Sequence, residues 1–218
     1  MHVHVNAATS ADGKLSTRRR EQVHISGEED FARVDRLRAE HDAVAVGVGT
    51  VLADDPSLVR FDSERRAAVG KSGVPARVVA DSRARTPPDA AILAGGAPTY
   101  VLVSERAPRE RRERLEAAGA ALVVAGEERV DLDGAFAALA DDGIAEVMVE
   151  GGGELIYSLF AAGLVDELTV FVGPVVVGGR DAPTLADGEG FVDPAAFPAL
   201  DLVGVERLGE GVVLRWQA

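Results

Sequence analysis

The chain has 218 residues, 47% of them hydrophobic, which is enough to bury the core of one large domain or two small ones. Its formal charge of −13 excludes a general nucleic-acid or membrane-surface binder, and no apolar run reaches the ~20 residues of a membrane helix. The absence of cysteine excludes disulfides, thiolate catalysis and cysteine-zinc sites. Because the first five residues also lack the features of a signal peptide, we expect a cytoplasmic protein.

The charged residues are unusual in kind as well as in number. Acidic residues outnumber basic ones by 36 to 23, and Lys14 and Lys71 are the only lysines. An acid-rich surface with little lysine is typical of adaptation to a high-salt cytoplasm, where salt screens the repulsion between carboxylates. A GC-rich genome explains the loss of lysine but not the excess of acid. We therefore expect a halophilic protein.

Short apolar strands alternate with helical patterns, which predicts an α/β protein. The first strand is expected at 2–8, and an S-G-E-E capping box at 26–29 predicts the start of a helix with apolar residues at Phe31, Val34 and Leu37. Further strands are expected at 44–48, 77–80, 100–103, 122–124, 146–149 and 167–172, and helices at 106–118, 132–140 and 154–162.

The tail predicts an antiparallel hairpin of residues 201–206 and 212–216 around a Gly-Glu-Gly turn. Together these elements predict a single domain, residues 1–218. We expect it to have a mixed, mostly parallel central sheet with helices on both faces and an antiparallel C-terminal hairpin.

Several catalytic and binding motifs are missing. The four histidines show no metal-ligand spacing, so no metal site is expected. Gly70, Lys71 and Ser72 resemble the end of a P-loop, but Arg65 stands where its first glycine belongs and no strand precedes it. This segment is therefore predicted to be a solvated loop. No G-x-S-x-G nucleophile elbow and no Tyr-x-x-x-Lys pair is present.

Two glycine clusters follow predicted strands, G-V-G-T at 47–50 and E-G-G-G-E at 150–154. Free N–H groups at a helix start, with no side chains in the way, attract a phosphate. Each cluster alone is equally consistent with a tight structural turn, but two in one sheet favour a nucleotide-binding cleft. A third segment, D-S-R-A-R at 81–85, follows another strand, and Ser82, Arg83 and Arg85 there are suited to the 2′-phosphate of NADPH. Two solvated arginines are the alternative.

Six motifs occur in a fixed order: S-A-D-G-K at 10–14, L-R-A at 37–39, G-V-G-T-V-L-A-D-D-P at 47–56, D-S at 81–82, V-E-G-G-G at 149–153 and L-V-D-E-L at 164–168. Together they resemble the reductase of riboflavin biosynthesis, which follows the deaminase in bifunctional enzymes and stands alone in archaeal and fungal types. The likeness covers most of the chain. It implies a dihydrofolate-reductase-like fold, a homodimer, a phosphorylated pyrimidine substrate and NADPH as cofactor, with NADH as an alternative.

The resemblance also implies roles for individual residues. Arg38, Leu58 and Arg60 would face the substrate, the two arginines at its 5′-phosphate, and Glu150 and Lys14 would act catalytically near the reacting ribose. Leu58 as a core residue, and Arg38 paired with Glu40 or Asp42 on its own helix, are the structural alternatives. The residues implied in cofactor binding are Thr50, Asp54, Ser82, Arg83, Gly151, Gly152, Gly153, Glu154 and Leu155.

The chain departs from the family in residues 16–24, which leaves the roles of Gln22 and His24 open. It also lacks the zinc deaminase motif, so any deaminase activity resides elsewhere. The leading hypothesis is an NADPH-dependent reductase that converts a ribosylamino-pyrimidinone phosphate to its ribitylamino form. One alternative is a pterin or dihydrofolate reductase, with Asp30 or Asp35 as the acid that faces a pteridine. Another is a non-catalytic nucleotide-binding protein.

Overall fold

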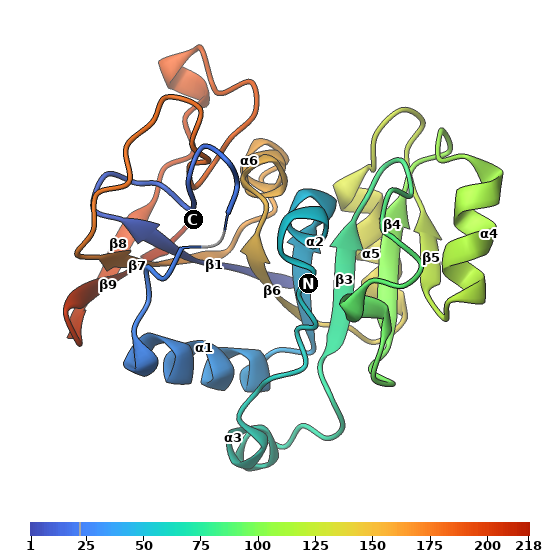
Figure 1. Cartoon of the computed structure of the whole chain (residues 1–218), viewed down its shortest axis with the longest axis horizontal. Coiled ribbons are helices and arrows are strands. Elements are labelled where there is room, and N and C mark those ends of the chain that lie inside the picture. The colour runs from blue at the N-terminus through green and yellow to red at the C-terminus, as the bar shows by residue number, and fades with distance from the viewer. Residues whose placement is uncertain (22) are drawn as a thin grey trace.

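The computed structural model describes residues 1–21 and 23–218, and its centre is one nine-stranded sheet (Figure 1). Strands β5-β4-β3-β2-β6-β1-β7 are parallel, and the hairpin β9-β8 continues the sheet antiparallel to β7. The predicted mixed sheet and C-terminal hairpin are therefore confirmed. The strands are β1 (His2–Ser10), β2 (Ala43–Gly47), β3 (Ala76–Ala80), β4 (Thr99–Val103), β5 (Ala121–Val124), β6 (Glu146–Gly151), β7 (Glu167–Gly173), β8 (Asp201–Leu208) and β9 (Gly211–Gln217).

Six α-helices connect the strands in the described part of the chain. They are α1 (Glu28–Glu40), α2 (Val48–Asp54), α3 (Ser63–Ala68), α4 (Arg109–Ala117), α5 (Leu132–Asp141) and α6 (Gly153–Ala161), with short 3-10 turns at Ala91–Leu93 and Pro194–Ala196. The predicted capping box is wrong, because Gly27 is the N-cap of α1 and makes no side-chain cap. The Ser26 hydroxyl instead donates to the Asp30 carboxylate, 2.5 Å away.

Alternate residues of the strands build two separate hydrophobic cores, one on each face of the sheet. On one face, Ala43 and Ala45 of β2 pack with the apolar sides of α5 and α6. On the other, Val44 and Val46 pack with Val51 of α2 and Leu115 of α4. This alternation is what a central parallel strand covered on both sides requires, and it fixes the register of β2 between β3 and β6.

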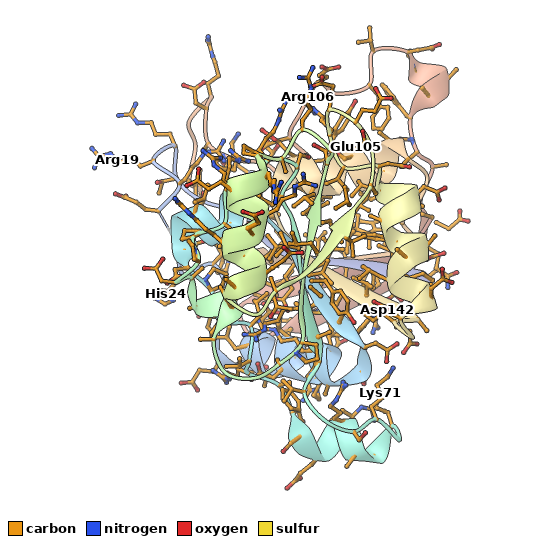
Figure 2. All side chains as sticks on the ribbon, turned by 90° about the vertical axis from the view of Figure 1, so that its right-hand side faces the viewer. Arg19, His24, Lys71, Glu105, Arg106 and Asp142 are labelled. Atoms are coloured by element: carbon orange, nitrogen blue, oxygen red, sulfur yellow. The ribbon has the colours of Figure 1, made fainter. Side chains whose placement is uncertain are left out.

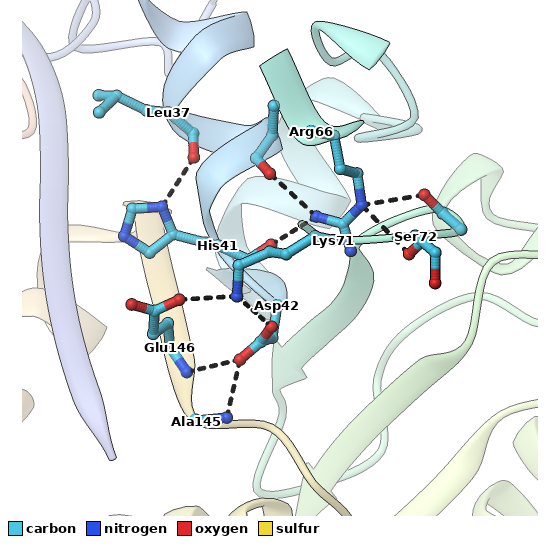
Figure 3. Close-up of polar contacts among 10 residues, drawn as sticks. Leu37, His41, Asp42, Arg66, Lys71, Ser72, Ala145 and Glu146 are labelled. Carbon is cyan, nitrogen blue, oxygen red and sulfur yellow. Dashed lines mark hydrogen bonds and ion pairs between the residues drawn. The ribbon is translucent and has the colours of Figure 1, made fainter. Parts of the chain in front are cut away.

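At the amino ends of the strands, polar contacts hold α3 and the chain after it against the sheet (Figure 3). Lys71 contacts Asp42, and its ammonium group lies 2.7 Å from the Glu146 carboxylate at the start of β6. Buried Arg66 donates to the carbonyl oxygens of Ala39 and His41 at the end of α1, and to those of two residues that follow Lys71. The predicted loop at 70–72 is present and mostly exposed, but its Lys71 is held by two carboxylates.

Figure 2 shows Lys71 and Arg106 at opposite ends of the molecule, so the Lys71 contacts lie far from the carboxyl ends of the strands. Among the helices of residues 1–21 and 23–218, none has the length and apolar character needed to cross a membrane.

Candidate active site

A cavity of about 920 Å³ opens over the carboxyl ends of β1, β2, β3 and β6. This is the edge at which open α/β sheets bind ligands. The wall combines the turns after β2 and β6, the loop after β3 and one side of α1. Of the residues predicted for the site, those that line the cavity are Arg38, Thr50, Asp54, Ser82, Arg83, Arg85, Glu150, Gly151, Gly152, Gly153, Glu154 and Leu155.

The two predicted glycine turns lie against each other, because β2 and β6 are neighbours in the sheet. Gly152 has a φ of +95°, and a Cβ there would stand 3.1 Å from the Cα and N atoms of Gly47. Only glycine combines this backbone conformation with so close an approach. Gly152 therefore does form the tight strand-to-helix turn that the sequence offered as an alternative.

The same turn leaves the start of α6 open to the cavity. The first hydrogen bond of the helix runs from the N–H of Ile156 to the carbonyl of Gly152, so the preceding N–H groups are available to a ligand. A Cβ at Gly153 would stand 2.8 Å from both the Thr184 carbonyl oxygen and the Asp187 carboxylate. A side chain at Gly153 is thus excluded, and the free N–H groups of the glycine turn that lines the cavity can bind an anionic group such as a pyrophosphate.

Two residues of α2 complete this side of the cavity. The Thr50 hydroxyl lies beside the second turn, since a Cβ at Gly151 would be 3.3 Å from its oxygen. Asp54 stands at the last position of α2, where partial burial raises the pKa of its carboxyl group.

Arg38 and Glu150 form a two-point ion pair across the cavity wall. Arg38 lies on α1 and Glu150 near the end of β6, with Nε 2.5 Å from Oε1 and Nη2 2.6 Å from Oε2. Both side chains are largely buried, at 16% and 12% exposed. Burial alone would lower the pKa of Arg38, but hydrogen bonds to Glu150 and the charges of Glu150 and Asp35 raise it. The alternative pairing of Arg38 with Glu40 or Asp42 is wrong.

Asp35 extends this pair toward the surface. Its carboxylate lies 3.7 Å from Arg38 Nη1 and 2.6 Å from Arg60 Nε. Arg38 also donates to the Arg60 carbonyl oxygen, at 3.0 Å. The structure therefore brings together the two arginines predicted for the substrate phosphate, although Arg60 is 72% exposed and lies outside the cavity lining.

Leu58 and Lys14 do not reach the cavity lining in the structure. The Leu58 side chain is buried in the core formed with Val44 and Val46, as its structural alternative predicts. Lys14 follows β1, pairs with Thr184 through a single backbone bridge, and directs its ammonium group to the Ala182 carbonyl oxygen at 3.4 Å. Their roles toward substrate stay predictions.

The far end of the cavity is lined by the loops after β3 and β5. The Ser82 hydroxyl accepts a hydrogen bond from the Val130 N–H at 3.0 Å. Arg83 and Arg85 are about half exposed and lie 3.1 Å from Glu128 and 3.8 Å from Asp81, respectively. Arg83 is therefore paired while half of its side chain stays exposed, and its role toward a 2′-phosphate stays a prediction. Glu128 was not predicted, because nothing in the sequence connects the loop after β5 with the end of β3.

Sequence reasoning also missed a buried polar group where β1 and α1 line the cavity. Asn6, 4% exposed, lines the cavity from β1, and its amide oxygen accepts from Arg33 Nη1 at 2.9 Å. Arg33 Nε also donates to the buried carboxylate of Asp30, at 2.8 Å. The only signal in the sequence is an asparagine inside a predicted strand. No group of three or more metal-ligating side chains occurs among the described residues.

Comparison with known proteins identifies the family. The model of the RibD C-terminal domain matches residues 1–214. The chain belongs to this family. It is 47% identical to the 2,5-diamino-6-ribosylamino-4(3H)-pyrimidinone 5′-phosphate reductase of Archaeoglobus fulgidus, over 96% of this chain and 94% of that one. It is 48% identical to the reductase of the same name from Methanothermobacter thermautotrophicus, over 99% and 97%.

The solved structure of Acinetobacter baumannii RibD has the same fold over this domain. It superposes with a TM-score of 0.79 at 26% identity, and the match covers 99% of this chain but 57% of that longer protein. The resemblance to the riboflavin reductases and the predicted fold are therefore confirmed.

Proposed function

We propose that this protein reduces 2,5-diamino-6-ribosylamino-4(3H)-pyrimidinone 5′-phosphate to its ribitylamino form, with NADPH as the electron donor. Two relatives that match it along almost their whole length carry the name of that reductase. The observation that carries the proposal is the position of the Arg38–Glu150 pair in the same cavity as the open start of α6. One cavity thus offers a carboxylate, a phosphate-binding guanidinium and a dinucleotide site.

Gly151, Gly152 and Gly153, with the first N–H groups of α6, would hold the pyrophosphate of the dinucleotide. Thr50 and Asp54 would bind the adjoining part, and the loop after β3 the adenosine end. When bound, the dinucleotide supplies the hydride. The chain's own groups are left to open the ribose ring, to stabilise charge and to hold the substrate in line.

Reduction of a ribosylamine requires the sugar ring to open, which places an imine or iminium carbon at C1′ and needs a proton at the ring oxygen. The Glu150 carboxylate is suited to stabilise the cationic iminium form. Arg38 and Arg60 are suited to the 5′-phosphate, since a guanidinium matches phosphate oxygens with parallel N–H groups. We assign proton donation or binding of the ribose hydroxyls to Lys14.

Asn6 is suited to orient the pyrimidinone ring. Because Arg33 holds its amide oxygen, the amide nitrogen is the end left to donate toward an acceptor on the ligand.

The pterin reductase alternative needs a carboxylate that is free to bind a pteridine. Asp30 is held by Ser26 and Arg33, and the pair of Arg38 and Arg60 favours a phosphorylated substrate instead.

The test is NADPH oxidation by the purified protein with the diamino pyrimidinone phosphate, its deaminated counterpart and dihydrofolate as separate substrates. We expect turnover with the first. Turnover of dihydrofolate alone would favour the pterin alternative, and binding of NADPH without turnover of any of the three would favour the non-catalytic one.

We further propose that residues 1–218 act as a single domain, form a homodimer and work in a salt-rich cytoplasm.

The outer strand β8 supports the dimer, because Leu202, Val203 and Val205 are more than half exposed along its length. A sheet edge with such residues is a surface that a second copy can cover. Light scattering at several protein concentrations measures the mass. A monomer at all of them would contradict the dimer.

A further inference from the structure

The carboxylate of Glu128 lies between two arginines at the adenosine end of the cavity. Its Oε2 is 3.1 Å from Arg83 Nη2, and its Oε1 is 2.6 Å from the guanidinium of Arg106. Arg83 comes from the loop after β3, Arg106 from the loop after β4, and Glu128 from the loop after β5. Three neighbouring strand ends therefore meet in one alternating charge cluster, and Figure 2 shows Arg106 at that end of the molecule.

The backbone fixes Glu128 in this place. The Ser104 hydroxyl approaches the Glu128 carbonyl oxygen at 3.3 Å, and the Arg106 N–H donates to the carbonyl of Glu127 at 3.1 Å. The loop is also tightly folded, since a Cβ at Gly126 would stand 2.3 Å from the Arg129 carbonyl oxygen. The backbone of the loop is thus held in place, and from it the Glu128 carboxylate reaches Arg83 and Arg106.

Glu128 lines the same cavity as Ser82, Arg83 and Arg85. In Rossmann-type dinucleotide sites, an acidic side chain binds the ribose hydroxyls of NADH, whereas an arginine accommodates the 2′-phosphate of NADPH. This chain places both kinds of group side by side and pairs them. The arginine suited to the phosphate is therefore already occupied by a carboxylate.

We propose that Glu128 is a specificity-determining residue that lowers the preference of this site for NADPH over NADH. The inference rests on the proposed nicotinamide-dependent activity. A 2′-phosphate must displace the Glu128 carboxylate from Arg83 and then remain close to a like charge, whereas a 2′-hydroxyl does neither. The three side chains are about half exposed, so the pair is weak enough for a phosphate to replace it.

The experiment compares two variants that remove one negative charge each, one residue apart. Glu128→Gln removes the carboxylate that contacts Arg83. Glu127→Gln is the control, because Glu127 is exposed and is not among the residues that line the cavity. The dissociation constants of NADPH and NADH are measured for each protein by the fluorescence of the reduced nicotinamide, without substrate and at one fixed salt concentration.

We expect Glu128→Gln to tighten NADPH binding about fivefold and to change NADH binding less than about twofold, which raises the selectivity ratio. Glu127→Gln should leave that ratio within about twofold of the wild-type value. In an Arg83→Met background, Glu128→Gln should no longer raise the ratio, because the pair is already broken.

An unchanged ratio in Glu128→Gln would overturn the inference. An equal rise in both single variants would also overturn it, since that result would reflect the general charge of the surface. If the wild-type protein bound neither dinucleotide, the proposed function itself would be wrong. Binding measurements on the wild-type protein therefore separate the two failures.

Discussion

Arg38 on α1 holds both carboxylate oxygens of Glu150 on β6, at 2.5 and 2.6 Å, inside the cavity that carries the open start of α6. Each of the two side chains has a second role in the proposed reaction, one at the substrate phosphate and one at the reacting carbon. The pair therefore connects the phosphate-binding and reacting ends of the substrate.

Replacement of Glu150 by glutamine keeps the size of the side chain and removes the carboxylate charge. We expect kcat to fall by ~10-fold or more, because the cationic transition state loses its counter-charge, while NADPH still binds. Lys14→Met should lower kcat similarly if Lys14 donates a proton or holds the ribose. Steady-state kinetics measure both effects. A near-normal kcat with only a raised KM would reduce either residue to a binding group.

Glu150→Gln should also change the affinity of the site for inorganic phosphate. Two N–H groups of Arg38 face Glu150 and a third faces the Arg60 carbonyl, so a phosphate has to compete with the carboxylate for this guanidinium. We expect Glu150→Gln to bind phosphate about fivefold more tightly, measured by calorimetry. Asp54→Asn, which removes another cavity carboxylate, is the control. Equal gains in the two variants would indicate only a general charge effect.

Gly152→Ala should destabilise the fold by about 2 kcal/mol, since the added Cβ meets the backbone of Gly47 and the residue has a positive φ. Gly163 is a matched control, because its φ is also positive, at +65°, but a Cβ there would have no atom within 4 Å. Thermal unfolding of both alanine variants separates backbone strain from steric clash. Equal melting temperatures would show that the two glycine turns are not closely packed.

Burial, with the nearby charges of His41, His2 and Arg33, lowers the pKa of His4 from 6.5 to about 3. Between these values the unfolded chain binds a proton that the folded protein does not. Above pH 6.5 the buried neutral His4 does not reduce the free energy of unfolding. As the pH falls from 6.5 toward 3, the free energy of unfolding decreases, because protonation favours the unfolded chain. From pH 7 to 4.5 the wild-type protein should lose about 2 kcal/mol more than His4→Gln in denaturant unfolding. Equal losses would mean that His4 is protonated in the folded protein, for which Glu167, 3.7 Å away, is the available partner.

The excess of acidic residues predicts a strong dependence of stability on salt. Molar KCl screens repulsion between carboxylates at the surface, so the melting temperature should rise steeply from low to molar salt. Differential scanning calorimetry across that range measures the effect. A flat melting temperature would favour the GC-rich genome as the source of the composition.

The sequence predicted the strands well, because the central strands are short apolar runs. Such runs are needed where a strand is buried between neighbouring strands and covered on both faces. Helix α3 was not predicted, since its S-E-R-R-A-A sequence has no apolar face. Its N-cap is Asp62, whose carboxylate accepts from the Arg65 N–H at 2.9 Å, and Arg66 fixes the helix to the end of α1. The start of α1 was misplaced because the Ser26 hydroxyl found a side-chain partner instead of a backbone one.

In the site, the glycine turns were predictable because a strand, a glycine run and a helix follow one another in the chain. The Asn6–Arg33 and Arg83–Glu128 contacts were not. Each joins side chains from elements that become neighbours only once the sheet is assembled, so no local spacing reveals it. The family resemblance supplied Arg38 and Glu150 as separate residues, and only the structure shows that they contact each other.

The order of strands in the sheet also bears on how the protein is made. Strand β1 leaves the ribosome before the other strands of this sheet, yet its two neighbours are β6 and β7. Pairings between such distant segments form slowly, because a long loop must close before any contact is gained. Synthesis must therefore reach Gly173 before β1 is paired on both sides. Until then the apolar residues of β1 are not fully covered and could associate with other chains. The large negative charge opposes such association and keeps the chain soluble.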